Sequence, residues 1–227
     1  MSKKLSDYLF YSDNWATIYC GDCREILPML EPVDLVLTDP PYGINYRGGF
    51  VGGKSPKDWP AKFSKGCSII GDDKAFDPTP FLDFPSVILW GANNYCRYLP
   101  QGQWLVWLKT RSTQRMLDQS DAELAWKKGG YAVYVFEHMW FGLCRDSEIA
   151  EPVLHPTQKP IALMKWCIEK SKNTKIILDP FLGSGTTCLA AKNLNRKSIG
   201  IEIEPKYCEV AVKRLRQEVF DFRGTNA

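Results

Sequence analysis

The segment Asp39-Pro40-Pro41-Tyr42 combines residue types that can hold an amino group on a flat ring. It follows an apolar run, residues 33–38, with the composition of a buried strand. The two prolines remove backbone donors, so nearby carbonyl groups can accept hydrogen bonds without competing N–H groups. The Asp39 carboxylate is a second acceptor, and the Tyr42 ring offers a flat face for stacking. These residues favour a site for the exocyclic amino group of a planar base.

A second segment, residues 179–187, is typical of a turn from a strand into a nucleoside-binding helix. Within it, Gly183 and Gly185 allow a ligand to approach the backbone closely. The N-terminus of the following helix presents N–H groups to an anion. Glu202 lies about 20 residues after these glycines, at the end of the next expected strand, where nucleotide-binding folds place the acid that holds a ribose.

Two other phosphate-binding motifs do not fit this segment. A P-loop needs a lysine after its last glycine, but Gly185 is followed by Thr186 and Thr187. The dinucleotide fingerprint needs a third small residue where this chain has Cys188, which argues against a pyrophosphate and against a nicotinamide oxidoreductase. The ligand is therefore expected to carry a ribose and a small anion. S-adenosyl-L-methionine, with its ribose and carboxylate, fits this description.

The elements that must position these segments alternate between strands and helices. Strands are expected at residues 16–20, 33–38, 86–90, 103–108, 131–137, 175–178 and 198–203, and helices at 24–30, 114–126, 160–171, 186–194 and 205–219. Residues 1–14 are expected to be an irregular lead-in. The final strand–helix–strand–helix series with short links is typical of a right-handed parallel sheet. The sequence thus predicts an α/β fold with a doubly wound, mostly parallel sheet.

Composition limits the class of protein. The chain has 227 residues, 44% of them hydrophobic and 24% charged, which suits one globular domain with a full core. No apolar run is long enough to cross a bilayer and no signal peptide is recognisable, so we expect no membrane association and an intracellular, cytoplasmic location. The net charge of +3 does not by itself indicate a polyanionic partner.

The eight cysteines are scattered and do not suggest a disulfide framework. Four of them are expected to be buried apolar residues in a reducing compartment: Cys96, Cys167, Cys188 and Cys208. Cys20 and Cys23 have the CxxC spacing of zinc ligands, but no second pair or nearby histidine completes a site. No metal is therefore expected.

Together, these segments resemble the beta-class, permuted amino-methyltransferases of DNA, which act on adenine N6 or cytosine N4. The matching stretches are residues 21–27, 39–42, 155–160, 179–187 and 200–207. They occur in the family's permuted order, with the amine motif before the cofactor turn. The resemblance implies the class I S-adenosylmethionine-dependent methyltransferase fold, with the strands that end at Asp39 and Asp179 side by side. It also implies a binding crevice at the topological switch point.

The resemblance implies roles for individual residues. Asp39 and the carbonyl of Pro40 would accept hydrogen bonds from the target amino group. Pro41 completes the motif, and Tyr42 would stack on a base flipped out of duplex DNA. Lys159 would be the partner of the cofactor carboxylate. The expected cofactor-binding set comprises Asp22, Cys23, Thr157, Lys159, Asp179, Phe181, Gly183, Ser184, Gly185, Thr186, Glu202 and Ile203.

The expected DNA contacts lie mostly in one segment. The loop from Gly43 to Asp77 leaves the amine motif directly and mixes basic and aromatic residues, which suits contact with a DNA backbone and unstacked bases. The predicted DNA-binding residues are Tyr46, Arg47, Lys54, Lys57 and Asn93. A disordered surface loop is the competing interpretation of this segment. Residues 1–227 are expected to form a single methyltransferase domain, with this loop flexible and without a separate target-recognition domain.

The first residue of the amine motif bears on the choice of base. Adenine-N6 members of the family usually carry aspartate there and cytosine-N4 members usually carry serine, so Asp39 favours adenine. Three hypotheses compete with it: cytosine N4, an amino group on RNA, and a catalytically silent DNA-binding module. Carbon-5 methylation of cytosine is disfavoured, because the chain has no Pro-Cys pair to supply a nucleophile. Double-stranded DNA is the expected partner, and the resemblance is compatible with a homodimer and with a cognate restriction endonuclease.

Overall fold

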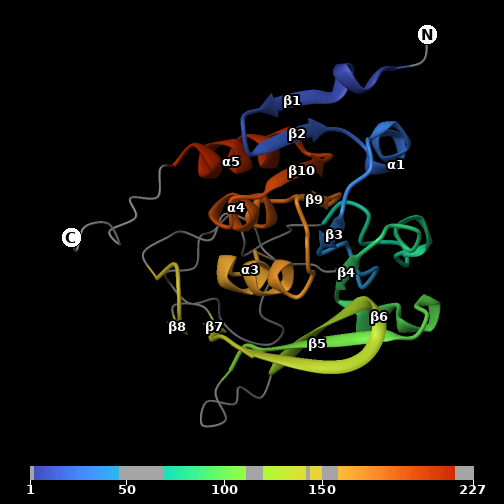
Figure 1. Cartoon of the computed structure of the whole chain (residues 1–227), viewed down its shortest axis with the longest axis vertical. Coiled ribbons are helices and arrows are strands. Elements are labelled where there is room, and N and C mark those ends of the chain that lie inside the picture. The colour runs from blue at the N-terminus through green and yellow to red at the C-terminus, as the bar shows by residue number, and fades with distance from the viewer. Residues whose placement is uncertain (1–2, 46–68, 111–119, 142–143, 150–157, 218–227) are drawn as a thin grey trace.

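The computed structural model describes residues 3–45, 69–110, 120–141, 144–149 and 158–217. Within these residues, eight strands form one sheet in the order β1-β2-β10-β9-β3-β4-β6-β5 (Figure 1). The strands of this sheet are β1 Leu9–Ser12, β2 Ala16–Cys20, β3 Leu35–Thr38, β4 Val87–Trp90, β5 Gly102–Leu108, β6 Ala122–Glu137, β9 Ile176–Asp179 and β10 Lys197–Glu202. The helices are α1 Cys23–Ile26, α3 Ile161–Glu169, α4 Thr186–Asn193 and α5 Pro205–Arg216. A separate two-stranded ribbon consists of β7 Trp140–Phe141 and β8 Cys144–Arg145.

The central strands run parallel, as the sequence predicts. β10 pairs in parallel with β2 and β9, and β3 pairs in parallel with β9 and β4. β1 joins β2 antiparallel at one edge, and β6 joins β4 antiparallel towards the other. The predicted α/β fold with a mostly parallel sheet is therefore confirmed.

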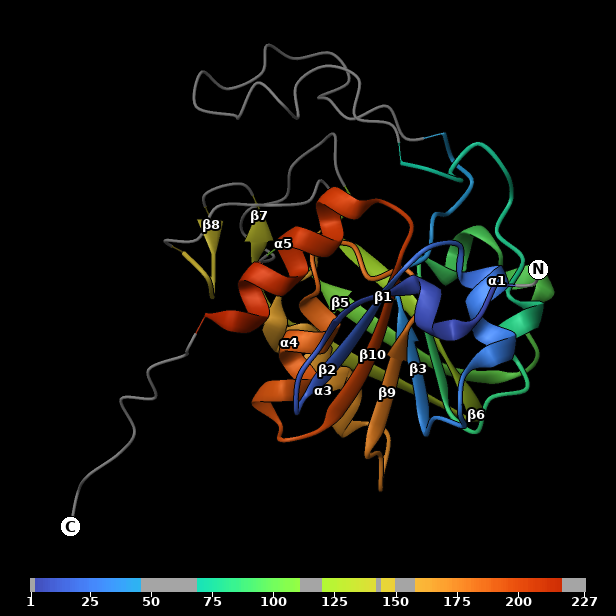
Figure 2. The same ribbon diagram turned by 90° about the horizontal axis from the view of Figure 1, so that it is seen from above.

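Helices cover both faces of the sheet, with α3, α4 and α5 on one side and α1 on the other (Figures 1 and 2). Side chains alternate along β3, so neighbouring residues enter different layers. Leu35 and Leu37 lie in one apolar cluster with Leu163 of α3, whereas Val36 lies in another with Ile26 of α1. This double burial explains why β3 is apolar at nearly every position.

The register of the sheet brings the ends of β3 and β9 together. Leu35 pairs with Ile177 and Val36 with Leu178 in parallel, so the carboxyl ends of both strands lie at the same end of the sheet. There the Thr38 hydroxyl donates a buried 2.6 Å hydrogen bond to Asp179, although 141 positions separate the two residues. The two segments with predicted chemistry therefore begin side by side.

The expected irregular lead-in over residues 1–14 is wrong in its described part. A 3₁₀ turn spans Leu5–Tyr8, and β1 follows it as an edge strand. Asp13 accepts hydrogen bonds from the backbone N–H groups of Trp15 and Ala16, which closes the turn into β2. This strand is stabilised by pairing with β2 and not by a pattern in its own four residues, so the sequence did not predict it.

The expected helix over residues 114–126 is wrong where the structure describes it, because its last residues begin β6. Trp126 is buried and pairs with Leu89 of β4, so pairing across the sheet overrides the local helical pattern. β6 then turns midway and returns along the other side of β5, and Figure 1 shows it curling around that strand. The returning arm contains the strand predicted at residues 131–137.

We predict that Thr38→Val lowers the free energy of unfolding by about 1–3 kcal/mol, because the buried Asp179 carboxylate loses a donor. Thr17→Val is the matched control, since the Thr17 hydroxyl lies 3.1 Å from that of Ser12 at an exposed position. Urea denaturation measures both variants. Equal losses in the two would contradict a specific role for the Thr38 hydrogen bond.

Candidate active site

Asp39 lies directly after the carboxyl end of β3, a central strand, with only 14% of its side chain exposed. Its Oδ2 atom is 2.5 Å from the ammonium of Lys159, and its Oδ1 atom accepts a hydrogen bond from the Tyr42 hydroxyl. Burial raises the pKa of Asp39, and the charge of Lys159 opposes that rise. The close ammonium therefore favours an ionised carboxylate that can accept hydrogen bonds.

Lys159, which the family resemblance assigns to the cofactor carboxylate, contacts the amine motif. Its side chain is 5% exposed, and its ammonium contacts Asp39 and also Glu123, at 3.1 Å. Burial alone would lower the pKa of Lys159, but the two carboxylates outweigh it, so the pKa lies above its ordinary value. In this structure Lys159 is thus a counter-ion of the amine motif, and its contact with a cofactor carboxylate stays a prediction.

Tyr42 packs closely against the start of the turn after β4. A Cβ atom at Gly91 would overlap the Tyr42 ring, and Gly91 also has a positive φ of 69°. Glycine is thus required here for both conformation and space. Burial and the charge of Asp39 raise the pKa of Tyr42, which keeps its hydroxyl protonated as a donor.

The segment after β9 forms the predicted tight turn into α4. Gly183 and Gly185 have positive φ angles of 52° and 81°, and Gly185 is the N-cap residue of α4. A Cβ atom at Gly185 would lie 2.7 Å from that of Ala211 in α5. The close approach of α5 therefore adds a packing reason for glycine to the conformational one.

Arg214 of α5 donates hydrogen bonds to this turn, a contact that the sequence did not predict. The buried guanidinium donates to the Ser184 carbonyl at 2.9 Å and to the Thr186 hydroxyl at 3.0 Å. It also lies 3.5 Å from a carboxylate oxygen of Glu148. An arginine one position before Leu215, on the apolar stripe of the closing helix, was the signal that could have revealed it.

Glu202 ends β10 beside the glycine turn, where the sequence places it. One carboxylate oxygen accepts a hydrogen bond from the Gly183 backbone and the other from the Glu204 backbone, both at 2.8 Å. Burial raises the pKa of Glu202, and these backbone donors oppose the rise. The next residue, Ile203, is 46% exposed although it is apolar.

The other predicted site residues divide into three groups. Asp22 is the N-cap of α1 and accepts from the Arg24 backbone, with Cys23 half-buried beside it. Phe181 packs edge-on against Phe76 and Phe81 in an aromatic cluster. Five predicted residues lie outside the described part of the chain: Tyr46, Arg47, Lys54, Lys57 and Thr157.

Asn93 and the described ends of the loop at residues 43–77 lie near the amine motif. Asn93 is exposed on a 3₁₀ turn, Ala92–Asn94, that follows β4. Asp72 accepts a 2.8 Å hydrogen bond from the Gly43 backbone, so the two described ends of the loop are tied together. The role of Asn93 in DNA binding stays a prediction.

Glu123 is a further residue of the site that the sequence did not indicate. It lies on the first part of β6, and its second oxygen accepts a 3.0 Å hydrogen bond from Lys109. The expected helix over residues 114–126 would have placed it on a solvated surface. A carboxylate within the otherwise apolar stretch 122–126 was the available signal.

The cysteines do not contribute a metal site to the described part of the chain. Cys167, Cys188 and Cys208 are buried as predicted, but Cys96 is exposed because it lies on a short turn, so that expectation is wrong. Burial raises the pKa of Cys23 to about 11, which disfavours the thiolate that zinc requires. Among the residues that the structure describes, no His, Cys, Asp and Glu cluster could hold a metal, and no helix is long and apolar enough to cross a membrane.

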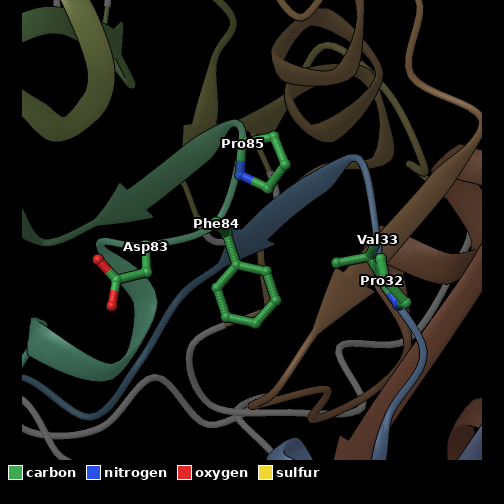
Figure 3. A pocket seen from close by; sticks show the side chains of 5 residues that line it. All are labelled: Pro32, Val33, Asp83, Phe84 and Pro85. Carbon is green, nitrogen blue, oxygen red and sulfur yellow. The ribbon is translucent and has the colours of Figure 1, made fainter.

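A shallow hollow lies at the opposite end of the sheet, where β3 and β4 begin (Figure 3). Its lining residues are Pro32, Val33, Asp83, Phe84 and Pro85. Asp83 is the one titratable group among them, and it has no chemical partner in this lining. The hollow is therefore not a candidate site, because parallel sheets bind ligands at the carboxyl ends of their strands.

The described site places amine acceptors and a nucleoside-binding turn at neighbouring strand ends. Asp39 and the Pro40 carbonyl follow β3, and the glycine turn and Glu202 follow β9 and β10. Acceptor groups and a glycine turn at neighbouring strand ends are typical of α/β enzymes that bring a nucleoside-containing cofactor to a substrate.

Comparisons with known proteins specify the family. The family model N6_N4_Mtase, described as DNA methylase, matches residues 86–213. The type II methyltransferase M.HinfI of Haemophilus influenzae is 53% identical over 272 residues, covering 96% of this chain and 71% of that protein. The chain belongs to this family of S-adenosylmethionine-dependent DNA amino-methyltransferases, which confirms the resemblance found in the sequence.

Solved structures support the same conclusion. The crystal structure of an M1.HpyAVI–SAM complex superposes with a TM-score of 0.54 at 28% identity, covering 88% of this chain and 99% of that one. PvuII DNA methyltransferase, which is cytosine-N4-specific, has a TM-score of 0.57 at 16% identity, covering 92% and 89% of the two chains. The second likeness bears on the fold alone, and both show the class I methyltransferase fold.

Proposed function

We propose that this chain transfers the methyl group of S-adenosylmethionine to N6 of adenine in double-stranded DNA, after the base has flipped out of the helix. The observation that carries the proposal is the position of Asp39 at the end of β3, beside the glycine turn at the end of β9. An amine acceptor and a nucleoside-binding turn thus share the edge of the sheet where open α/β folds bind ligands.

The groups around the glycine turn fit S-adenosylmethionine chemically. Both oxygens of Glu202 accept backbone hydrogen bonds, and because a carboxylate has about four acceptor positions it can also accept from a ribose hydroxyl. Exposed Ile203 offers an apolar surface for a flat adenine. The bound cofactor supplies a methyl group on a sulfonium. The other proposed contacts, by family resemblance, are Asp22, Cys23, Thr157, Asp179, Phe181, Gly183, Ser184, Gly185 and Thr186.

The amine motif fits an exocyclic amino group. Asp39 would accept one of its N–H groups and the Pro40 carbonyl the other, which draws the nitrogen lone pair out of ring conjugation. Lys159 supports this role, because a carboxylate that its ammonium keeps ionised is the stronger acceptor. Since the Tyr42 hydroxyl bonds to Asp39, we infer that this hydroxyl leaves Asp39 when the Tyr42 ring stacks on an incoming base.

Adenine is the favoured base because the amine motif begins with aspartate. The same acceptor geometry serves the amino group of adenine and that of cytosine, so the base must be tested directly. The name type II methyltransferase, carried by M.HinfI, supports a place beside a cognate restriction endonuclease in the cytoplasm. A homodimer and a DNA contact at Asn93 complete the proposal.

The purified protein is expected to transfer labelled methyl groups from S-adenosylmethionine to unmethylated duplex DNA. Hydrolysis of that DNA should release label in N6-methyladenine. The same DNA, first exhausted with unlabelled cofactor and enzyme, is the control and should accept no label. Label in N4-methylcytosine would overturn the choice of base, and a cofactor-bound protein that transfers nothing would overturn the proposed activity.

Asp39→Ala is expected to reduce methyl transfer by a factor of about 10² or more, because the acceptor that aligns the amine is lost. Cofactor affinity should change little, since Asp39 lies on the amine side of the crevice. Lys159 keeps Glu123 as a buried partner in this variant, which favours retained folding. Asp83→Ala, at the opposite end of the sheet, is the matched control and should transfer normally. Turnover near the wild-type rate in Asp39→Ala would contradict its assigned role.

A further inference from the structure

Four charged side chains form a continuous row at the amine motif. Lys159 Nζ lies 2.5 Å from Asp39 Oδ2 and 3.1 Å from Glu123 Oε2. The other oxygen of Glu123 accepts a 3.0 Å hydrogen bond from Lys109. The row therefore alternates in sign, from Asp39 at the end of β3 to Lys109 just after β5.

Burial separates this row from a surface ion pair. The side chains of Lys159 and Asp39 are 5% and 14% exposed, so solvent and salt screen their interaction little. Exposed pairs contribute almost nothing to stability, whereas each charge in a buried row changes the state of the next. The charge of Glu123 therefore acts on Asp39 as well as on Lys159.

We propose that Glu123 is a positioning residue for methyl transfer, which holds Lys159 between two carboxylates so that Asp39 remains a strong acceptor for the target amine. This inference rests on the proposed function of Asp39. If Lys159 paired with Asp39 alone, the full positive charge of its ammonium would act on the Asp39 carboxylate. The Asp39 oxygens would then be weaker acceptors for the substrate N–H. With Glu123 on its other side, the ammonium divides that charge.

The contact between Glu123 and Lys159 is suited to this division. Glu123 Oε2 lies 3.1 Å from Lys159 Nζ, within ion-pair distance. The shorter bond to Asp39 fixes the direction of the ammonium, and Glu123 attracts the same charge from its other side. Lys109 anchors the other oxygen of Glu123 and so fixes the position of that carboxylate.

The groups that face Asp39 have opposing effects. Burial raises the pKa of Asp39, Lys159 lowers it and Glu123 raises it again. The Tyr42 hydroxyl lowers it by donating a hydrogen bond to the ionised form. The other titratable or charged groups coupled to this carboxylate are Tyr95, Asp179 and, through Glu123, Lys109.

The alternating charges of this row determine the direction in which each substitution shifts the pH dependence of methyl transfer. Asp39 must be ionised to accept the amine, so transfer falls on the acid side at the apparent pKa of the coupled row. Removing the negative charge of Glu123 lowers that apparent pKa, and the acid limb moves to lower pH. Removing Lys109, which offsets Glu123, raises the apparent pKa, and the limb moves to higher pH. A purely structural role would not give opposite signs at two neighbouring residues.

The test is single-turnover methyl transfer to duplex DNA with saturating cofactor, across the pH range in which each variant stays folded. Glu123→Gln is expected to lower the plateau rate roughly tenfold or more and to shift the acid limb to lower pH, with unchanged cofactor affinity. Lys109→Gln should shift the limb to higher pH. Glu123→Asp, which keeps the charge, should restore most of the limb's position.

Glu137→Gln is the matched control, because it makes the same change at an exposed position on the same strand. A Glu123→Gln variant that behaves like Glu137→Gln, or two row variants that shift the limb in the same direction, would overturn the inference. If Glu123→Gln does not fold, the shift in Lys109→Gln decides, and its absence counts against the proposal. A wild-type protein without any transfer would instead refute the proposed function itself.

Discussion

Three carboxylates must be buried side by side at one edge of a parallel sheet, and the rest of the site depends on how their charges are offset. Asp39, Asp179 and Glu202 each stand at or just after the end of a neighbouring strand. Burial opposes the ionisation of all three, and the charge of Asp39 also opposes that of Asp179. A different donor relieves each one: the Lys159 ammonium, the Thr38 hydroxyl and the Gly183 backbone. The charges of Asp39 and of Glu202 are thus offset by different groups, although a hydrogen bond from Thr38 to Asp179 joins the ends of β3 and β9.

The closing helix links this arrangement to the stability of the whole domain. Arg214 holds the glycine turn by its backbone and hydroxyl groups, and Ala211 packs where a side chain at Gly185 would lie. Glu148 joins the same arginine and also accepts from the backbone of Ile161 at the start of α3. Loss of α5 packing would therefore disturb the cofactor turn before it disturbed the amine motif.

Local chemistry in the sequence was enough to predict the ends of β3, β9 and β10. Their apolar runs need burial on both faces, and the acids that follow them mark the binding edge. The sequence could not reveal β6, whose first arm depends on pairing with β4 and β5, nor β1, which depends on β2. Glu123 and Arg214 were missed for the same reason, because their partners are distant in the chain. The ion pairs of Lys159 with Asp39 and Glu123 were not predicted either, because both partners are distant in the chain.

A crystal structure of the protein with duplex DNA and a cofactor analogue that cannot transfer a methyl group would show which groups hold the target amine. We expect a flipped adenine whose amino nitrogen lies within hydrogen-bond distance of Asp39 and the Pro40 carbonyl. Lys159 should still contact Asp39 and Glu123, and Glu202 should contact the ribose. A target amine held by other groups, with the Tyr42 hydroxyl still on Asp39, would show that Asp39 is not the amine acceptor.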